Sequence, residues 1–249
     1  MRQKPRRASY TLAEAFGPVW RIFENMLPQH DTTPRGPWLA AALTRFAAGN
    51  DDLVPATRSL LVRAIAAPAQ HGCLINTLSL LEHVGSHKIM ATQHRADIDQ
   101  ATLRHVAEEA HHAYFMKRQA EKTADRPLEY VAADLLAPAA ARMYFQRLEA
   151  ATVRTLGRDG GSRAAYLYMS MIVEFRALWF YGLYQEMLQR ARHVLSLKRV
   201  IGEEQNHLEE MATRLEAAGA RNDAHVATLL GRERVLYSRL LAAMSRAVA

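Results

Sequence analysis

Two glutamates stand directly before two histidines in the stretch His105–Lys117, HVAEEAHHAYFMK. The stretch can be read as Glu-x-x-His in two registers, either Glu108 with His111 or Glu109 with His112. Residues three apart lie on one face of a helix, so either pair has the spacing of two ligands to one metal ion. The residues that share a face with each pair decide between the registers.

The two faces differ in polarity. The first, with Glu109 and His112, also carries Thr102, Val106, Ala113, Met116 and Ala120. The second, with Glu108 and His111, carries Arg104, Phe115 and Arg118. We therefore expect Glu109 and His112 to point into the core, and Glu108 and His111 to lie at its solvent edge. His105 lies on the inward face one turn before Glu109. Two roles stay open for it, an additional metal ligand or a partner that orients a ligand.

A second Glu-x-x-His element, Glu204 to His207 in EEQNH, falls on a face that is otherwise apolar. That face carries Leu197, Val200, Ile201, Leu208 and Met211. Burying a carboxylate and an imidazole there without partners would be costly, and a bound metal would satisfy both.

Two further helical segments each place one acid on an apolar face. Glu82 shares its face with Ile75, Leu78 and Ile89, and Glu174 shares its face with Leu167, Met171 and Leu178. The chain thus supplies one glutamate from each of two helices and Glu-x-x-His from each of two others, which is the ligand pattern of dimetal sites in helical bundles. A distant arginine as the partner of Glu174 is the alternative.

Small residues lie next to both single glutamates. They leave room for a substrate beside the metals, although small residues serve equally for close helix packing. The expected pocket residues are Ser79, Gly85, Ser86, Ser170, Ala177 and Tyr181.

The spacing of the four glutamates predicts how the helices are connected. The intervals are 27 residues from Glu82 to Glu109, 65 from there to Glu174, and 30 from there to Glu204. Short first and third intervals predict antiparallel pairs, and the long middle interval predicts a crossover between them. The four long helices are expected at 69–93, 100–124, 162–190 and 192–218. Other helices are expected at 12–26, 38–48, 53–66, 138–155 and 224–247, with loops at 28–37 and 157–162 and a short helix before 138.

Composition agrees with an all-α protein of one domain. The 249 residues are 49% hydrophobic and rich in alanine and leucine, with no long β-branched run. We divide the chain into an N-terminal helical extension, 1–66, a bundle, 69–218, and a C-terminal helix, 222–249. No apolar run reaches the length of a membrane span, and the basic N-terminus lacks the apolar segment of a secretory signal. One cysteine, Cys73, excludes an internal disulfide and favours the cytoplasm.

The net charge of +7 comes from scattered basic residues. No nucleic-acid-binding module is recognisable, so a nucleic-acid partner is not expected. An acidic substrate or carrier protein fits this charge.

With these elements, the sequence resembles the ferritin-like di-iron carboxylate superfamily. The stretches EEAHHA and EEQNH are similar to the ligand elements of its oxygenases, and the resemblance covers residues 69–215. It implies a four-helix bundle with two iron ions, manganese being the main competitor. Glu109 and Glu204 would bridge the metals, Glu82 and Glu174 would be terminal ligands, and His112 and His207 would complete the set.

The resemblance stops at the level of the superfamily. Arylamine N-oxygenases carry an extra histidine ligand one turn before the last Glu-x-x-His, where this chain has Val200. Ribonucleotide reductase small subunits carry a radical tyrosine one turn after the first ligand histidine, where this chain has Met116.

The function that this implies is O₂-dependent oxidation of a small, largely apolar organic substrate in specialised metabolism. Electrons would come from a ferredoxin or a reductase, and a homodimer is compatible with the superfamily. A ferroxidase or iron store and a non-catalytic helical bundle are the alternatives.

Overall fold

The computed structural model describes residues 37–91, 98–157 and 161–248, and every regular element in these ranges is helical. The expectation of an all-α bundle is confirmed. The elements are α2 (Pro37–Asn50), η1 (Asp51–Leu53), α3 (Val54–Ala66), α4 (Pro68–Ala91), α5 (Gln100–Ala124), η2 (Ala132–Asp134), α6 (Pro138–Leu156), α7 (Gly161–Arg190), α8 (Lys198–Ala217) and α9 (Asp223–Ala247). Among the helices described, none combines the length and the apolar character that crossing a membrane requires.

Local sequence signals explain where several helices begin. Pro68 and Pro138 stand at the first positions of α4 and α6, where a missing backbone N–H is tolerated. The Asp99 side chain caps α5 by accepting a hydrogen bond from the backbone N–H of Thr102, 2.7 Å away. The Asn222 side chain caps α9 in the same way.

Most predicted helices lie within two residues of the observed bounds, but α8 begins later than expected. The predicted start was residue 192, whereas the helix begins at Lys198. Arg192 has a φ of +52°, which interrupts helical geometry, and the N–H of Leu197 donates to the side chain of Gln185, 2.6 Å away. The predicted short helix before residue 138 is the single turn η2.

Some sequence predictions fall on residues that the structure leaves undescribed. The predicted helix 12–26 lies outside the described residues, as does the predicted loop 28–37 up to residue 36. Residues 158–160 of the predicted loop 157–162 also lie outside them, and α7 begins at Gly161.

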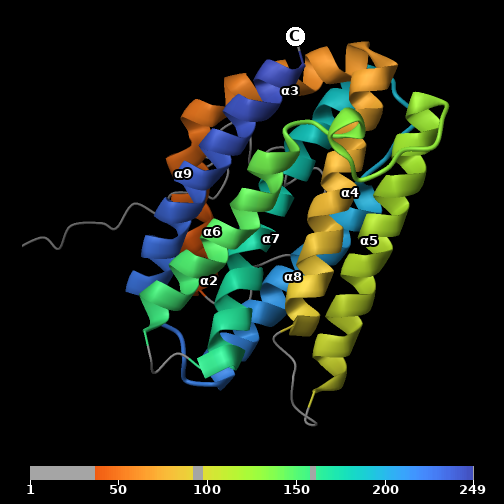
Figure 1. The fold of residues 1–249 in the computed structure, drawn as a ribbon. Helices are drawn as coiled ribbons and strands as arrows, with labels where there is room; N and C mark the ends of the chain where they lie inside the picture. Colours follow the sequence, from red (N-terminus) through yellow and green to blue (C-terminus); the bar gives the residue numbers. More distant parts are fainter. Residues whose placement is uncertain (1–36, 92–97, 158–160, 249) are drawn as a thin grey trace, which may run out of the picture.

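The long helices form two antiparallel pairs, α4 with α5 and α7 with α8 (Figure 1). A third pair, α6 with α9, packs beside them, and α3 packs against both α7 and α4. The predicted crossover between the first two pairs runs through η2 and α6 (Figure 1).

The α4 and α5 backbones approach each other closely at Gly72. A Cβ atom on Gly72 would lie 2.7 Å from the Cβ of Ala124 and 3.2 Å from the carbonyl oxygen of Ala120. Contacts below 3 Å between such atoms are repulsive, so glycine lets the two backbones approach at this end of the pair.

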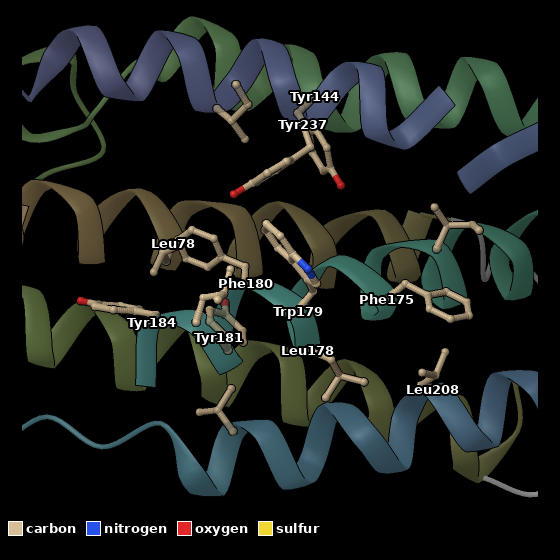
Figure 2. Packing of buried hydrophobic residues seen from close by; sticks show 14 of the residues in the cluster. Leu78, Tyr144, Phe175, Leu178, Trp179, Phe180, Tyr181, Tyr184, Leu208 and Tyr237 are labelled. Carbon is tan, nitrogen blue, oxygen red and sulfur yellow. The ribbon is translucent and has the colours of Figure 1, made fainter. Parts of the chain in front are cut away.

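Helix α7 is the central element of the core, which explains why its sequence is apolar nearly all round. Its large side chains are buried on several faces between the surrounding helices (Figure 2). They include Tyr168, Phe175, Trp179, Phe180, Tyr181 and Tyr184.

Helix α7 also carries a buried cation, Arg176, which pairs with Glu233 and not with Glu174. The Arg176 guanidinium donates to both carboxylate oxygens of Glu233 on α9 at 2.8 Å, and also to the side chain of Asn50 at 2.6 Å. Tyr144 donates to the same Glu233 carboxylate at 2.8 Å. Within the described ranges, the structure gives Glu174 no lysine or arginine partner, so a distant arginine is not its counter-charge there.

Candidate metal centre

Seven acidic and imidazole side chains converge in the core between α4, α5, α7 and α8. All of them are at most 9% exposed, although ionisable side chains are rarely buried to this degree without partners. Helix α5 contributes three of them and α8 two, while α4 and α7 contribute one each. They are Glu82, His105, Glu109, His112, Glu174, Glu204 and His207.

These side chains form two groups of four, and each group can surround one metal ion. In each group the ligand atoms lie within 4.8 Å of one another. We call them position 1, which is Glu82, Glu109, His112 and Glu204, and position 2, which is His105, Glu109, Glu174 and His207. Glu109 belongs to both groups, so its carboxylate would bridge two metals bound at these positions.

Position 2 is built around an oxygen of Glu109. His207 Nδ1 lies 3.2 Å and His105 Nε2 lies 3.3 Å from Glu109 Oε1. The same two histidine nitrogens lie 3.9 and 3.4 Å from Glu174 Oε1. His105 Nε2 therefore lies among the other donor atoms of position 2, which favours the role of an additional metal ligand.

Glu204 connects the two positions from the opposite side. Its Oε1 lies 3.3 Å from His112 Nδ1, and its Oε2 lies 3.0 Å from His207 Nδ1. A carboxylate whose two oxygens face one histidine of each group has the arrangement of a second bridge. At position 1, Glu82 also accepts a hydrogen bond from the hydroxyl of Tyr181.

The donor atoms at the centre fit a bound metal because the protein alone leaves several of them unsatisfied. Among the described residues, His105 Nε2, Glu109 Oε1 and His112 Nδ1 are buried without a hydrogen-bond partner. Each such atom costs about 1–3 kcal/mol when left unpaired. Carboxylate and imidazole ligands suit iron or manganese, and these three atoms point to where an ion would bind.

The outer nitrogens of two histidines contact carboxylates at the edge of the core. His207 Nε2 on α8 lies 2.8 Å from Glu108 on α5, and His112 Nε2 on α5 lies 2.9 Å from Glu203 on α8. Each carboxylate thus accepts an N–H from the histidine of the facing helix and leaves Nδ1 free to bind metal. Both acids immediately precede a bridging candidate.

These contacts correct the expectation for Glu108 and extend the set of functional residues. Glu108 lies at the edge as predicted, but its carboxylate contacts the His207 ring instead of only meeting solvent. His111 is exposed. Sequence reasoning missed Glu203, although the doubled acid in both EEAHH and EEQNH was a readable signal for it.

His105 is fixed by a residue that the sequence did not single out. Its Nδ1 lies 2.9 Å from the hydroxyl of Tyr166 on α7. Burial raises the pKa of Tyr166 to about 12, so the phenol keeps its proton at neutral pH. With Nδ1 engaged by this hydroxyl, Nε2 is the histidine nitrogen that faces position 2.

Electrostatics divide the carboxylates into two kinds. Burial, with the neighbouring carboxylates adding to it, raises the pKa of Glu82 and of Glu174 well above the usual range. Burial also acts to raise the pKa of Glu109, but the neighbouring imidazoles of His105 and His207 hold it well below the usual range. The pKa of Glu204 is likewise lowered: burial and Glu109 act to raise it, and His112 and His207 together outweigh them.

The two histidines of the Glu-x-x-His elements favour the protonated form in the metal-free core. Burial acts against the charge on His112, but Glu204 and the other carboxylates raise its pKa to about 10. Burial likewise acts to lower the pKa of His207, and Glu109 and Glu204 raise it far above its usual value. In the metal-free centre, protons on these two histidines therefore supply positive charge that bound metal ions would supply in the loaded centre.

The predicted pocket residues lie in different places. A cavity of about 340 Å³, lined in part by Gly85 and Ser170, reaches the centre from one side. A smaller cavity of about 70 Å³ is lined in part by Ala177 and Tyr181. Ser79 and Ser86 line neither cavity: Ser79 donates to the carbonyl of Ala113 at 2.6 Å, and Ser86 donates to a carbonyl of its own helix.

Comparison of the chain with models of known protein families, with curated proteins and with solved structures finds no match in any of the three. The interpretation of the centre therefore depends on its donor atoms, their geometry and the cavity beside it.

Proposed function

We propose that the protein is a non-haem di-iron oxygenase of the ferritin-like type that uses O₂ to oxidise a small, largely apolar organic substrate. One observation carries the proposal: two groups of buried ligand atoms share Glu109 in a helical core that opens on a cavity. When bound, a reduced iron pair supplies electrons to O₂, and manganese is the competing metal.

The chain's own residues would divide the work of holding the metals. Glu109 and Glu204 would bridge the positions, while Glu82 and Glu174 would each bind a single metal. His112 and His207 would bind through Nδ1, because Glu203 and Glu108 take up the opposite nitrogens.

The two positions would be unequal. Position 2 has two imidazoles, from His105 and His207, whereas position 1 has one, from His112. An additional neutral nitrogen donor changes the affinity and the redox potential of the metal that it binds. This chain has Val200 where arylamine N-oxygenases carry an additional histidine ligand on the second Glu-x-x-His helix. His105 would supply such a ligand from the first Glu-x-x-His helix, α5, instead.

The surroundings of the centre suit a reaction that must be kept from water. Next to the ligands, apolar side chains such as Phe145, Met169 and Val173 line the larger cavity. Excluding water strengthens the electrostatic interactions inside a site and prevents side reactions. An external electron donor, either a ferredoxin or a reductase, completes the proposal, and a cytoplasmic location and a homodimer stay predictions.

Metal analysis and O₂ uptake test the proposal together. Protein prepared without O₂ and loaded with Fe²⁺ should bind about two irons per chain and should consume O₂ when a reductant is supplied. Glu109→Ala removes the ligand that both positions share, so it should lose metal from both. Glu216→Ala, at an exposed site on α8, is the matched control and should behave as wild type.

The outcomes separate the candidate functions. Two irons without O₂ consumption would refute the oxygenase. Repeated oxidation of a large excess of Fe²⁺ without an organic substrate would instead support a ferroxidase. Less than about one metal per chain would favour a non-catalytic bundle.

A more specific variant tests the outer carboxylates. Glu203→Gln keeps the shape of the side chain but removes the charge that faces His112. Metal affinity should fall by about 10- to 100-fold, which is typical when the partner of a ligand histidine is changed. Titration of the metal-free protein with Mn²⁺ measures this loss, and an unchanged affinity would argue against a role for Glu203.

A further inference from the structure

The 340 Å³ cavity meets the metal centre on the side of position 2. His105, Glu109 and Glu174 of that group line it, whereas Glu82 and His112 of position 1 do not. A molecule in this cavity would therefore lie next to the metal that His105 and Glu174 would hold at position 2. This places the reacting end of a substrate at the position with two imidazoles.

A missing side chain keeps the route to that end open. A Cβ atom on Gly85 would lie 3.7 Å from Glu109 Oε2 and 4.0 Å from the ring of Phe145. A methyl group would still fit at these distances, but a larger side chain would enter the cavity next to the ligands. Gly85 is therefore the point at which the cavity can be closed without altering a ligand.

One charged pair, Lys88 and Glu149, interrupts the apolar lining. The two side chains form an ion pair between α4 and α6, and both line the cavity. Among the described residues that line this cavity, Lys88 is the single cationic side chain other than histidine. It follows Gly85 by three residues, a rise of about 4.5 Å along the helix. A charged head group at this pair would thus lie about one helical turn along α4 from Gly85, the residue that faces Glu109.

The exposure of the two partners indicates which charge a ligand would bring. The side chain of Lys88 is 22% exposed, whereas that of Glu149 is 47% exposed. Glu149 can turn into water at little cost, because exposed ion pairs contribute on the order of 1 kcal/mol or less. Lys88 would then lack a counter-charge in a partly buried place, and an anionic head group would supply one. A cationic head group would instead have to displace the more deeply placed Lys88.

We propose that the cavity binds an organic monocarboxylate, with its carboxylate on Lys88 in place of Glu149 and its apolar end at position 2. The proposal deepens the proposed function and depends on it for the role of the bound acid as substrate. The net charge of +7 would assist the approach of an anion.

Binding of a matched set of ligands tests the charge preference. Octanoate, octanamide and octylamine share one apolar chain and differ in the head group, and 4-butylbenzoate with its amide and amine repeats the series on an aromatic body. Calorimetry on the metal-free and on the Mn²⁺-loaded protein should show each acid binding at least about tenfold more tightly than its amide or amine.

Variants of the ion pair should act in opposite directions. Lys88→Met should reduce the preference for the acids to about twofold or less, while Glu149→Gln should tighten acid binding by freeing Lys88. Lys122→Met, at an exposed site near the far end of α5, is the matched control and should change nothing. Gly85→Leu should weaken all ligands while the metal content stays at the wild-type value.

The orientation has its own readout. In Mn²⁺-loaded protein, paramagnetic relaxation should be stronger for the terminal methyl protons of octanoate than for the CH₂ next to the carboxylate. The reverse order, tighter binding of the amines, unchanged preference in Lys88→Met, or failure of both acids to bind would each overturn the proposal. Because ligand binding is measured apart from metal content and O₂ uptake, failure of the monocarboxylate site and failure of the oxygenase are distinguishable.

Discussion

Loading two divalent cations into the metal-free protein should release protons from the core. The pKa values of Glu82 and Glu174 are raised well above the usual range by burial and by the neighbouring carboxylates, and we expect both to keep a proton near neutral pH. His112, whose pKa is raised to about 10 against the effect of burial, and His207, whose pKa is raised further, are protonated as well. A metal ion can bind these four side chains only after each has lost its proton.

The magnitude follows from this inventory. Glu109 and Glu204 have lowered pKa values and are already ionised, because their histidine contacts outweigh burial. Loading should therefore release about four protons per chain, one from each of the other four groups. Before loading, the two protonated histidines balance the two ionised carboxylates. After loading, two divalent cations balance four carboxylates, so the net charge of the centre is zero in both states. At about 1.4 kcal/mol per proton and pH unit, the free energy of filling both positions should weaken by about 5 kcal/mol for each unit that the pH falls.

Calorimetry in several buffers measures the proton count directly. Mn²⁺ is titrated at pH 7 into metal-free protein in buffers that differ in ionisation enthalpy, and the slope of the observed enthalpy gives the number of protons exchanged. Glu216→Gln removes an exposed carboxylate of α8 and should give the same slope as wild type. A slope of about one proton or fewer would refute the reasoning, since it would mean that the core is not protonated as its geometry requires.

Three further predictions concern stability. The melting temperature of the metal-free protein should fall as the pH rises from about 6.5 to 10. The folded core keeps protons that the unfolded chain loses, so the stabilisation from His112, whose pKa is raised to about 10, disappears over this range. Saturation with Mn²⁺ should remove the decline, and a melting temperature that rises with pH in metal-free protein would contradict the prediction. Gly72→Ala should lower the free energy of unfolding in urea by about 1–3 kcal/mol, because its Cβ would lie 2.7 Å from a side chain of α5; Gly202→Ala, a helix position with nothing within 4 Å, should instead raise it by about 0.5–1 kcal/mol. Arg176→Met should lower the free energy of unfolding by about 3–5 kcal/mol, because it leaves Glu233 buried without a cation. The double variant Arg176→Met with Glu233→Leu should recover most of this loss. Losses that add in the double variant would contradict this account.

The helical class and most helix bounds could be predicted because they depend on local patterns. Apolar residues at helical spacing, prolines at helix starts and capping side chains act over a few residues. The start of α8 was wrong because a contact distant in sequence, between Gln185 and the backbone of Leu197, holds the preceding segment out of the helix. No local pattern records such a contact.

The inward register of the first motif was also predictable, because burial of one helix face is visible in its apolar residues. The structure finds Glu109 and His112 buried and His111 exposed. The hydrogen bond of Glu108 to His207 was not predictable in this way, since it depends on where α8 crosses α5.

The pocket shows the same limit. Small residues beside Glu82 and Glu174 indicated room, yet Ser79 and Ser86 line neither cavity while Gly85 and Ser170 line the larger one. Helical spacing gives the face of a residue but not the neighbour that this face meets. Which small residue leaves a cavity and which lets two helices touch is decided by the packing of α4 against α5 and α6.

By itself, the sequence determined the helical class, the approximate limits of the helices and which acids and histidines lie on apolar faces, because each of these depends on periodicity within one helix. Only the tertiary structure decided that the seven side chains form two positions sharing Glu109, that His105 faces the second position, and that Glu203 and Glu108 hold histidines of the facing helix. These features depend on distances of 3–4 Å between helices, and such distances are set by the packing of side chains far apart in the chain.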